Sequence, residues 1–81
     1  MVETRSAPRF RVAKAAMIED GGFKVACTIR DLSLTGAAVE ITDLNTKTIP
    51  ATVTLIVPED GLKLSCRVVW RAPFRVGLAF T

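Results

Sequence analysis

Hydrophobic and polar residues alternate with a period of two along most of this chain, which is the pattern of half-buried β-strands. The clearest case runs from residue 23 to residue 30, where Phe23, Val25, Cys27 and Ile29 alternate with polar or small residues. No stretch of the sequence carries a sustained helical period. The chain is therefore predicted to be all-β.

The alternation divides into six predicted strands that are separated by turn signals. They cover residues 10–19, 23–30, 36–41, 51–57, 62–71 and 74–80. An Asp-Gly-Gly signal at residues 20–22 and a Pro-Glu-Asp-Gly signal at residues 58–61 favour tight turns, because glycine adopts positive φ at little cost and proline suits the first turn position. Six short strands of this kind predict a small antiparallel β-barrel, since closure removes the exposed edges of an open sheet.

The same phase predicts which side chains point into the barrel. Trp70 follows Val68 in the core phase of its strand, so it is predicted to pack inside rather than to form a stacking platform. Cys27 and Cys66 are also in core phase and belong to no C-x-x-C pair, which favours buried free thiols, with a disulfide as the alternative. The opposite phase of the last two strands carries three arginines that are predicted to be exposed: Arg67, Arg71 and Arg75.

Length and composition restrict the class of protein. Eighty-one residues allow one domain, and a hydrophobic content of 49% favours a folded domain over a disordered segment. Apolar stretches end after a few residues, so the sequence predicts no transmembrane helix, and no secretory signal is visible. The expected location is the cytoplasm.

The formal net charge of +3 is concentrated near the N-terminus. Residues 1–16 contain Arg5, Arg9, Arg11 and Lys14 against a single acidic residue, while the rest of the chain is balanced. A basic arm over residues 1–9, followed by a barrel over residues 10–81, is the predicted domain organisation. Such an arm suits an anionic partner such as a nucleotide, although a solubilising terminus has the same composition.

Catalytic chemistry finds little support in the sequence. The chain contains no histidine and no tyrosine, which excludes Ser-His-Asp and Cys-His arrangements and removes the commonest nitrogen ligand of zinc. No glycine-rich phosphate loop of the Walker type is present in the sequence. The protein is expected not to be an enzyme, and neither a metal nor a cofactor is expected.

Two short motifs carry the candidate chemistry. Arg5 and Arg9 form an R-x-x-x-R segment whose proline disfavours a helix, so both guanidinium groups are expected on a mobile arm. Asp31, Ser33 and Gly36 form a D-x-S-x-x-G segment that directly follows a predicted strand. Guanidinium groups bind phosphate oxygens and the O6/N7 edge of guanine, a carboxylate accepts from base donors, and glycine allows close approach of the backbone. Ordinary turn chemistry is the alternative explanation of the second motif.

Together, the motifs resemble the R-x-x-x-R and D/N-x-S-x-x-G signature of PilZ domains, which are bacterial receptors for cyclic di-GMP. The closing stretch from residue 68 to residue 80 is also similar to the end of a PilZ barrel. The resemblance implies that Arg5 and Arg9 grip guanine edges and phosphates. It further implies that Asp31 accepts from guanine N1–H or N2–H and that Ser33 meets a phosphate or ribose oxygen, while Gly36 sets the backbone geometry.

The resulting hypothesis is a cyclic di-GMP receptor that relays its signal to an unidentified effector protein or domain. The arm would fold over a ligand held against residues 31–36 and thereby change the surface that the barrel presents. One alternative is a PilZ-like adaptor that works through protein contacts alone. A second is a barrel that binds single-stranded nucleic acid, which is disfavoured because most of the five aromatic residues fall in core phase.

Overall fold

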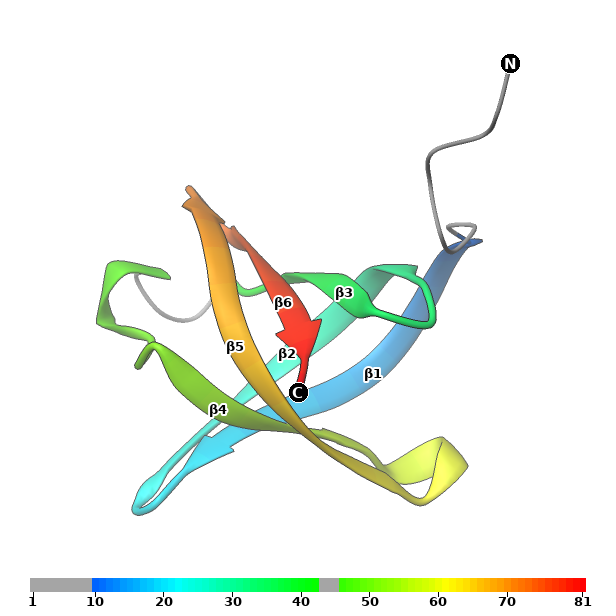
Figure 1. Ribbon diagram of the computed structural model, residues 1–81, viewed down its shortest axis with the longest axis horizontal. Helices are drawn as coiled ribbons and strands as arrows, with labels where there is room; N and C mark the ends of the chain where they lie inside the picture. Colours follow the sequence, from blue (N-terminus) through cyan, green and yellow to red (C-terminus); the bar gives the residue numbers. More distant parts are fainter. Residues whose placement is uncertain (1–9, 43–45) are drawn as a thin grey trace.

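A closed barrel of six antiparallel strands forms the described part of the chain, as the computed structural model shows for residues 10–42 and 46–81 (Figure 1). The strands are β1 (Phe10–Asp20), β2 (Phe23–Leu32), β3 (Gly36–Glu40), β4 (Thr52–Val57), β5 (Leu62–Ala72) and β6 (Arg75–Phe80). Two short 3₁₀ turns, η1 (Thr46–Thr48) and η2 (Pro58–Asp60), lie on either side of β4. The predicted all-β barrel is confirmed. Arg5 and Arg9, with the rest of the predicted arm, lie outside the described residues.

The strands close in the order β1-β2-β3-β6-β5-β4, and each neighbouring pair is antiparallel. The barrel closes where Met17–Glu19 of β1 pair with Thr54–Ile56 of β4. Inward-facing aliphatic residues from all six strands, joined by Ile49 from the connection before β4, fill the interior. The largest fully buried side chains are Ile18, Ile29, Ile41, Ile49, Leu55, Val39 and Val76.

Two glycines adopt the positive φ that their turns require. Gly21, between β1 and β2, has φ 59°, and Gly61, which ends η2, has φ 65°. Both turns were predicted from sequence. The two-residue connection between β5 and β6 is different, because Phe74 follows Pro73 there with φ 66°. A proline followed by a residue of positive φ is the geometry of a type II turn, which normally carries glycine or asparagine at the second position.

Three shifts in the register of strand pairing distinguish one side of the barrel from the other. One extra residue of β2, Arg30, lies between the pairs that join β2 to β3. Another extra residue, Val69, interrupts the pairing of β5 with β6. The third lies between Arg11 and Lys14 of β1. Such β-bulges change the face toward which the following side chains point.

The bulge at Val69 explains why the prediction that Trp70 lies in the core is wrong. Val68 packs against the core and pairs with Leu78, but Trp70 pairs with Gly77, which faces outward between two buried residues. The Trp70 side chain is 42% exposed as a result. Two further aromatic residues are exposed, so the statement that most aromatics fall in the core is also wrong: Phe10 is 60% and Phe74 is 59% exposed.

Both cysteines are free and buried, as the sequence predicted. Burial raises the pKa of the Cys27 thiol to about 12 and also raises the pKa of the Cys66 thiol. These thiols act as small apolar groups of the core, because the reactive thiolate is disfavoured there.

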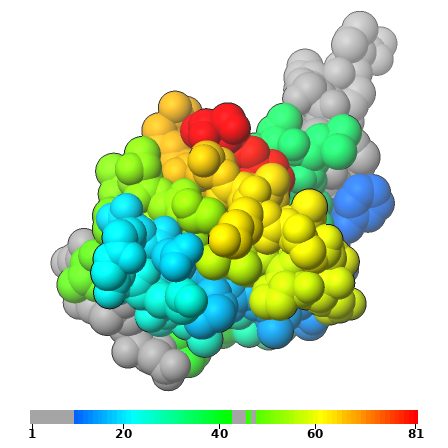
Figure 2. Space-filling view, turned by 90° about the horizontal axis from the view of Figure 1, so that it is seen from below, coloured from blue at the N-terminus to red at the C-terminus, as the bar shows by residue number. Residues whose placement is uncertain are grey.

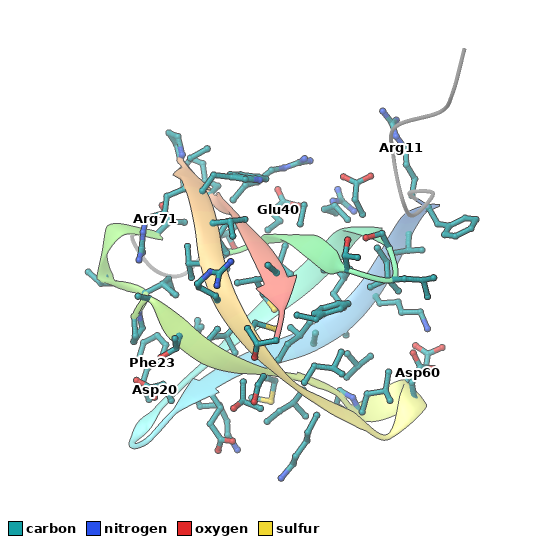
Figure 3. All side chains as sticks on the ribbon, in the orientation of Figure 1. Arg11, Asp20, Phe23, Glu40, Asp60 and Arg71 are labelled. Carbon is teal, nitrogen blue, oxygen red and sulfur yellow. The ribbon has the colours of Figure 1, made fainter. Side chains whose placement is uncertain are left out.

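Two contacts fasten the connections to the barrel. Arg71, which is exposed as predicted, donates from Nη1 to the backbone oxygens of Thr46 and Ile49, 2.6 Å from each (Figure 3). At the other end, Lys14 Nζ lies 2.7 Å from Asp60 Oδ2, and this hydrogen bond raises the pKa of the lysine. The view from below shows η2, in yellow, beside the blue residues of β1 (Figure 2).

Candidate functional site

A single cross-strand row on the outside of the barrel brings the second motif together with the exposed tryptophan. Arg11 of β1 pairs with Asp31 of β2, and Asp31 pairs with Ala38 of β3. Ala38 in turn pairs with Gly77 of β6, which pairs with Trp70 of β5. We call these five residues the outer row. Three strand spacings separate Asp31 from Trp70, about 14 Å along the curved sheet.

The bulge at Arg30 places Asp31 on the outer row. Ile29 is fully buried, and in a regular strand Asp31 would point the same way because side chains two apart share a face. With Arg30 as the extra residue, Leu32 packs against the core instead and Asp31 turns outward, where it is half-buried. A backbone irregularity therefore turns this carboxylate to the outside of the barrel, so that its charge is not placed in the core.

The two residues in the middle of the outer row are small and buried: Ala38 is 8% exposed, and Gly77 is covered. Ala38 offers one methyl group and Gly77 has no side chain. A Cβ built on Gly77 would lie 2.1 Å from Nε1 of Trp70 and 2.3 Å from its Cε2, so the indole lies directly over this glycine. The pyrrole part of the indole therefore covers Gly77, while part of the residue is exposed to the solvent.

Ser33 and Gly36 shape the turn between β2 and β3. Ser33 Oγ accepts hydrogen bonds from the backbone N–H groups of Thr35 and Gly36, each at 3.2 Å. The Ser33 backbone N–H also donates to the Gly36 oxygen at 2.9 Å. At Gly36, a Cβ would lie 2.2 Å from the backbone oxygen of Leu78, so β6 approaches too closely for any side chain. This close approach accounts for a glycine at position 36, and the roles of Ser33 and Gly36 at a ligand site stay predictions.

Charged neighbours of the outer row differ in their availability. Arg30 Nε lies 3.1 Å from Glu40 Oε1, so this guanidinium is held by an ion pair across β2 and β3. Arg11 is exposed and directly opposite Asp31 in the register (Figure 3). An exposed cation beside this carboxylate can interact with an anionic group of a ligand.

The sequence showed Arg11 only as one of the basic residues near the N-terminus, and it predicted that Trp70 packs inside. The bulges could not be seen in the sequence. An extra residue leaves the period-two pattern unchanged when the residues on both sides of it tolerate exposure. The register of the barrel was needed to align residues that lie some forty positions apart in the sequence, such as Asp31 and Trp70.

A family model of the PilZ domain matches residues 3–81. The chain belongs to the PilZ domain family. PilZ domains generally bind cyclic di-GMP and act as receptor or adaptor domains rather than as catalysts. No match to this chain was found among curated proteins. The matched residues include both motifs. Asp31 of the second motif lies on the outer row of this PilZ domain.

Across residues 10–42 and 46–81, no group of three or more His, Cys, Asp or Glu side chains is placed to hold a metal ion. Within the same ranges, no helix is long and apolar enough to cross a membrane.

Proposed function

We propose that this PilZ domain binds cyclic di-GMP on the outer row, with Arg5 and Arg9 closing over the ligand from the N-terminal arm. The observation that supports this proposal best is that Asp31 and the partly exposed Trp70 lie on one cross-strand row. A carboxylate and a partly exposed indole on one row suit a ligand that carries both aromatic bases and hydrogen-bond donors.

Guanine fits the chemistry of each end. The Asp31 carboxylate accepts from N1–H and N2–H together, and this donor pair exists in guanine and not in adenine. The exposed indole of Trp70 offers a stacking surface of the kind that contributes about 1–3 kcal/mol per base. The phosphates would be held by the guanidinium groups of Arg5 and Arg9, with Arg11 beside them.

The relay follows from the continuity of the arm with β1. The arm leads into β1 at Phe10, and Arg11 lies opposite Asp31. A ligand held by both the arm and the outer row would fix the arm against the barrel, and it would favour that state by its differential affinity. The changed surface would then be recognised by an effector protein or domain.

Isothermal titration calorimetry of the whole chain with cyclic di-GMP and cyclic di-AMP tests the proposal. We expect roughly micromolar affinity for cyclic di-GMP, about −8 kcal/mol. Arg5→Ala and Arg9→Ala should each remove about 2–3 kcal/mol, which weakens binding about 30- to 150-fold. Lys24→Ala is the matched control, because Lys24 is an exposed cation near the remote β1–β2 turn. Native affinity in both arginine variants would refute the role of the arm.

Selectivity tests the role of the carboxylate. Asp31→Ala should reduce the preference for cyclic di-GMP over cyclic di-AMP more than it reduces the contribution of the phosphates, since only the carboxylate distinguishes the two bases. Equal binding of both dinucleotides by the native domain would contradict the assignment of Asp31.

A nucleic-acid ligand remains the second candidate, because the exposure of Phe10, Trp70 and Phe74 removes the argument against it. Exposed aromatic residues near basic side chains are the features that bind single strands. Titration of the chain with a ten-nucleotide oligothymidylate under the same conditions distinguishes the nucleic-acid ligand from cyclic di-GMP. Tighter binding of the oligonucleotide than of cyclic di-GMP would favour this reading, and no binding of either ligand would favour the adaptor.

A further inference from the structure

The β5–β6 hairpin exposes three large apolar side chains close to one another along the chain. Val69 is 51% exposed, Trp70 is exposed on the outer row, and Phe74 occupies the connecting turn. Figure 1 shows this end of the hairpin at the upper left, away from the β1–β2 turn. Arg67 and Arg75 flank the three on β5 and β6. We call these five residues the hairpin patch.

Phe74 is an unusual choice for its position. Its φ of 66° lies in the left-handed region, which disfavours side chains with a Cβ and is normally occupied by glycine or asparagine. Its aromatic ring is mostly exposed, so it gains little from packing against the barrel. A residue that strains the backbone without filling the core is explained when its side chain makes a contact outside the domain.

The segment that forms β5 and β6 is basic. Residues 62–81 contain four basic residues and no aspartate or glutamate, whereas residues 17–61 contain seven acidic residues and three basic ones. Arg71 is engaged with the carbonyls of Thr46 and Ile49. Among the described residues, ion pairs within 4.0 Å involve Lys14, Lys24 and Arg30 only. Arg67 and Arg75 have no ion pair among these residues, and the carboxylate of Glu40, opposite Arg75, is paired with Arg30 instead.

We propose that the hairpin patch is a docking surface for an acidic segment of a partner protein, anchored by an aromatic or aliphatic side chain against Trp70 and Phe74. An apolar centre with charged residues at its margin, rich in aromatic residues and arginine, is the anatomy of a protein interface. The positive charges of Arg67 and Arg75 favour a partner segment that is acidic. The inference does not depend on nucleotide binding, although Trp70 belongs to both surfaces and would connect them.

Other polyanions fit the patch less well. The cross-strand partner of Arg75 is Glu40, and Asp31 lies at the far end of the outer row, so acidic groups interrupt any continuous track for a nucleic-acid backbone. The indole is packed over Gly77, which does not suit insertion of this side chain into a lipid surface.

Selection from a library of random twelve-residue peptides displayed on phage tests the docking surface with the intact, ligand-free chain as bait. We expect enrichment of peptides that combine aspartate or glutamate with an aromatic or aliphatic residue. Synthetic copies of the enriched peptides should bind at least tenfold more weakly to Arg67→Glu and to Phe74→Gly. The matched controls are Lys24→Glu and Leu34→Ser, which should bind the peptides as the native chain does. Leu34 is 83% exposed, but it lies in the β2–β3 turn, beside the end of β6 that is remote from the hairpin patch.

Phe74→Gly also separates docking from folding. Glycine adopts this φ freely, so the melting temperature of the variant should not fall while peptide binding is lost. The proposal is overturned if no acidic peptides are enriched, or if the enriched peptides bind the Arg67 and Phe74 variants as well as the native chain. It is also overturned if vesicles of anionic phospholipid or an oligothymidylate bind in a patch-dependent manner and acidic peptides do not.

Discussion

The two halves of the barrel follow the same alternating sequence pattern, but only one of them pairs regularly throughout. Around β4, the pairs with β1 and β5 run without interruption, and the inward residues Val53, Leu55 and Val57 are all buried. The half that contains the outer row holds all three shifts of register seen among the described residues. Regular pairing builds the core, and the bulges turn selected side chains outward.

This difference shows how a very small domain adds a binding surface without weakening its core. With 81 residues, the barrel cannot spare many inward positions. The extra residues Arg30 and Val69 leave the core phase to Leu32 and Val68, while Asp31 and Trp70 face the solvent. Bulges are frequent next to functional sites for this reason.

The largest effect should come from the regular half. Leu55 is fully buried among the core side chains, so Leu55→Ala should cost about 2–5 kcal/mol of unfolding free energy, measured by urea denaturation. The fraction that remains folded should still prefer cyclic di-GMP over cyclic di-AMP, because Leu55 does not reach the outer row. A change in selectivity would show that the two halves are not separable.

A pair of glycine substitutions sharpens the comparison within the other half. Gly36→Ala would meet the backbone oxygen of Leu78, which cannot move alone, so we expect a loss of about 1–3 kcal/mol in unfolding free energy. Gly77→Ala would meet only the side chain of Trp70, which can swing away. It should cost less stability, but it should shift the fluorescence of this single tryptophan and weaken nucleotide binding. Unchanged fluorescence in Gly77→Ala would contradict the position of the indole.

Much of the fold was predictable because strands and turns are signalled locally. The six strands, the glycine turns at residues 21 and 61, and the buried thiols follow from alternation and turn chemistry. The outward position of Trp70 was not predictable, since a bulge depends on how two distant strands align. The roles of Arg5 and Arg9 stay predictions, and the motif remains their support.

The smallest expected effect concerns the thiols, whose protection should be the same in both halves. Cys27 pairs with Ala16 in β1, and Cys66 pairs with Val53 in β4. Neither should react with iodoacetamide at pH 8 until urea unfolds the chain. Since the pKa of Cys27 rises from 9.0 to about 12 on folding, the unfolded chain loses this proton first. Stability should therefore be unaffected by this group below about pH 9 and fall as the pH rises towards 12. Rapid alkylation of either thiol in the native state would contradict an intact core.

The central claim is that cyclic di-GMP lies on the outer row and not elsewhere on the barrel. Titration of the ¹⁵N-labelled chain with cyclic di-GMP, followed by amide and indole N–H chemical shifts, tests it most directly. The account predicts the largest changes at Asp31, Ala38, Gly77 and the Trp70 indole, with β4 nearly unchanged. Largest changes in β4, or an unperturbed Trp70 indole at saturation, would contradict it.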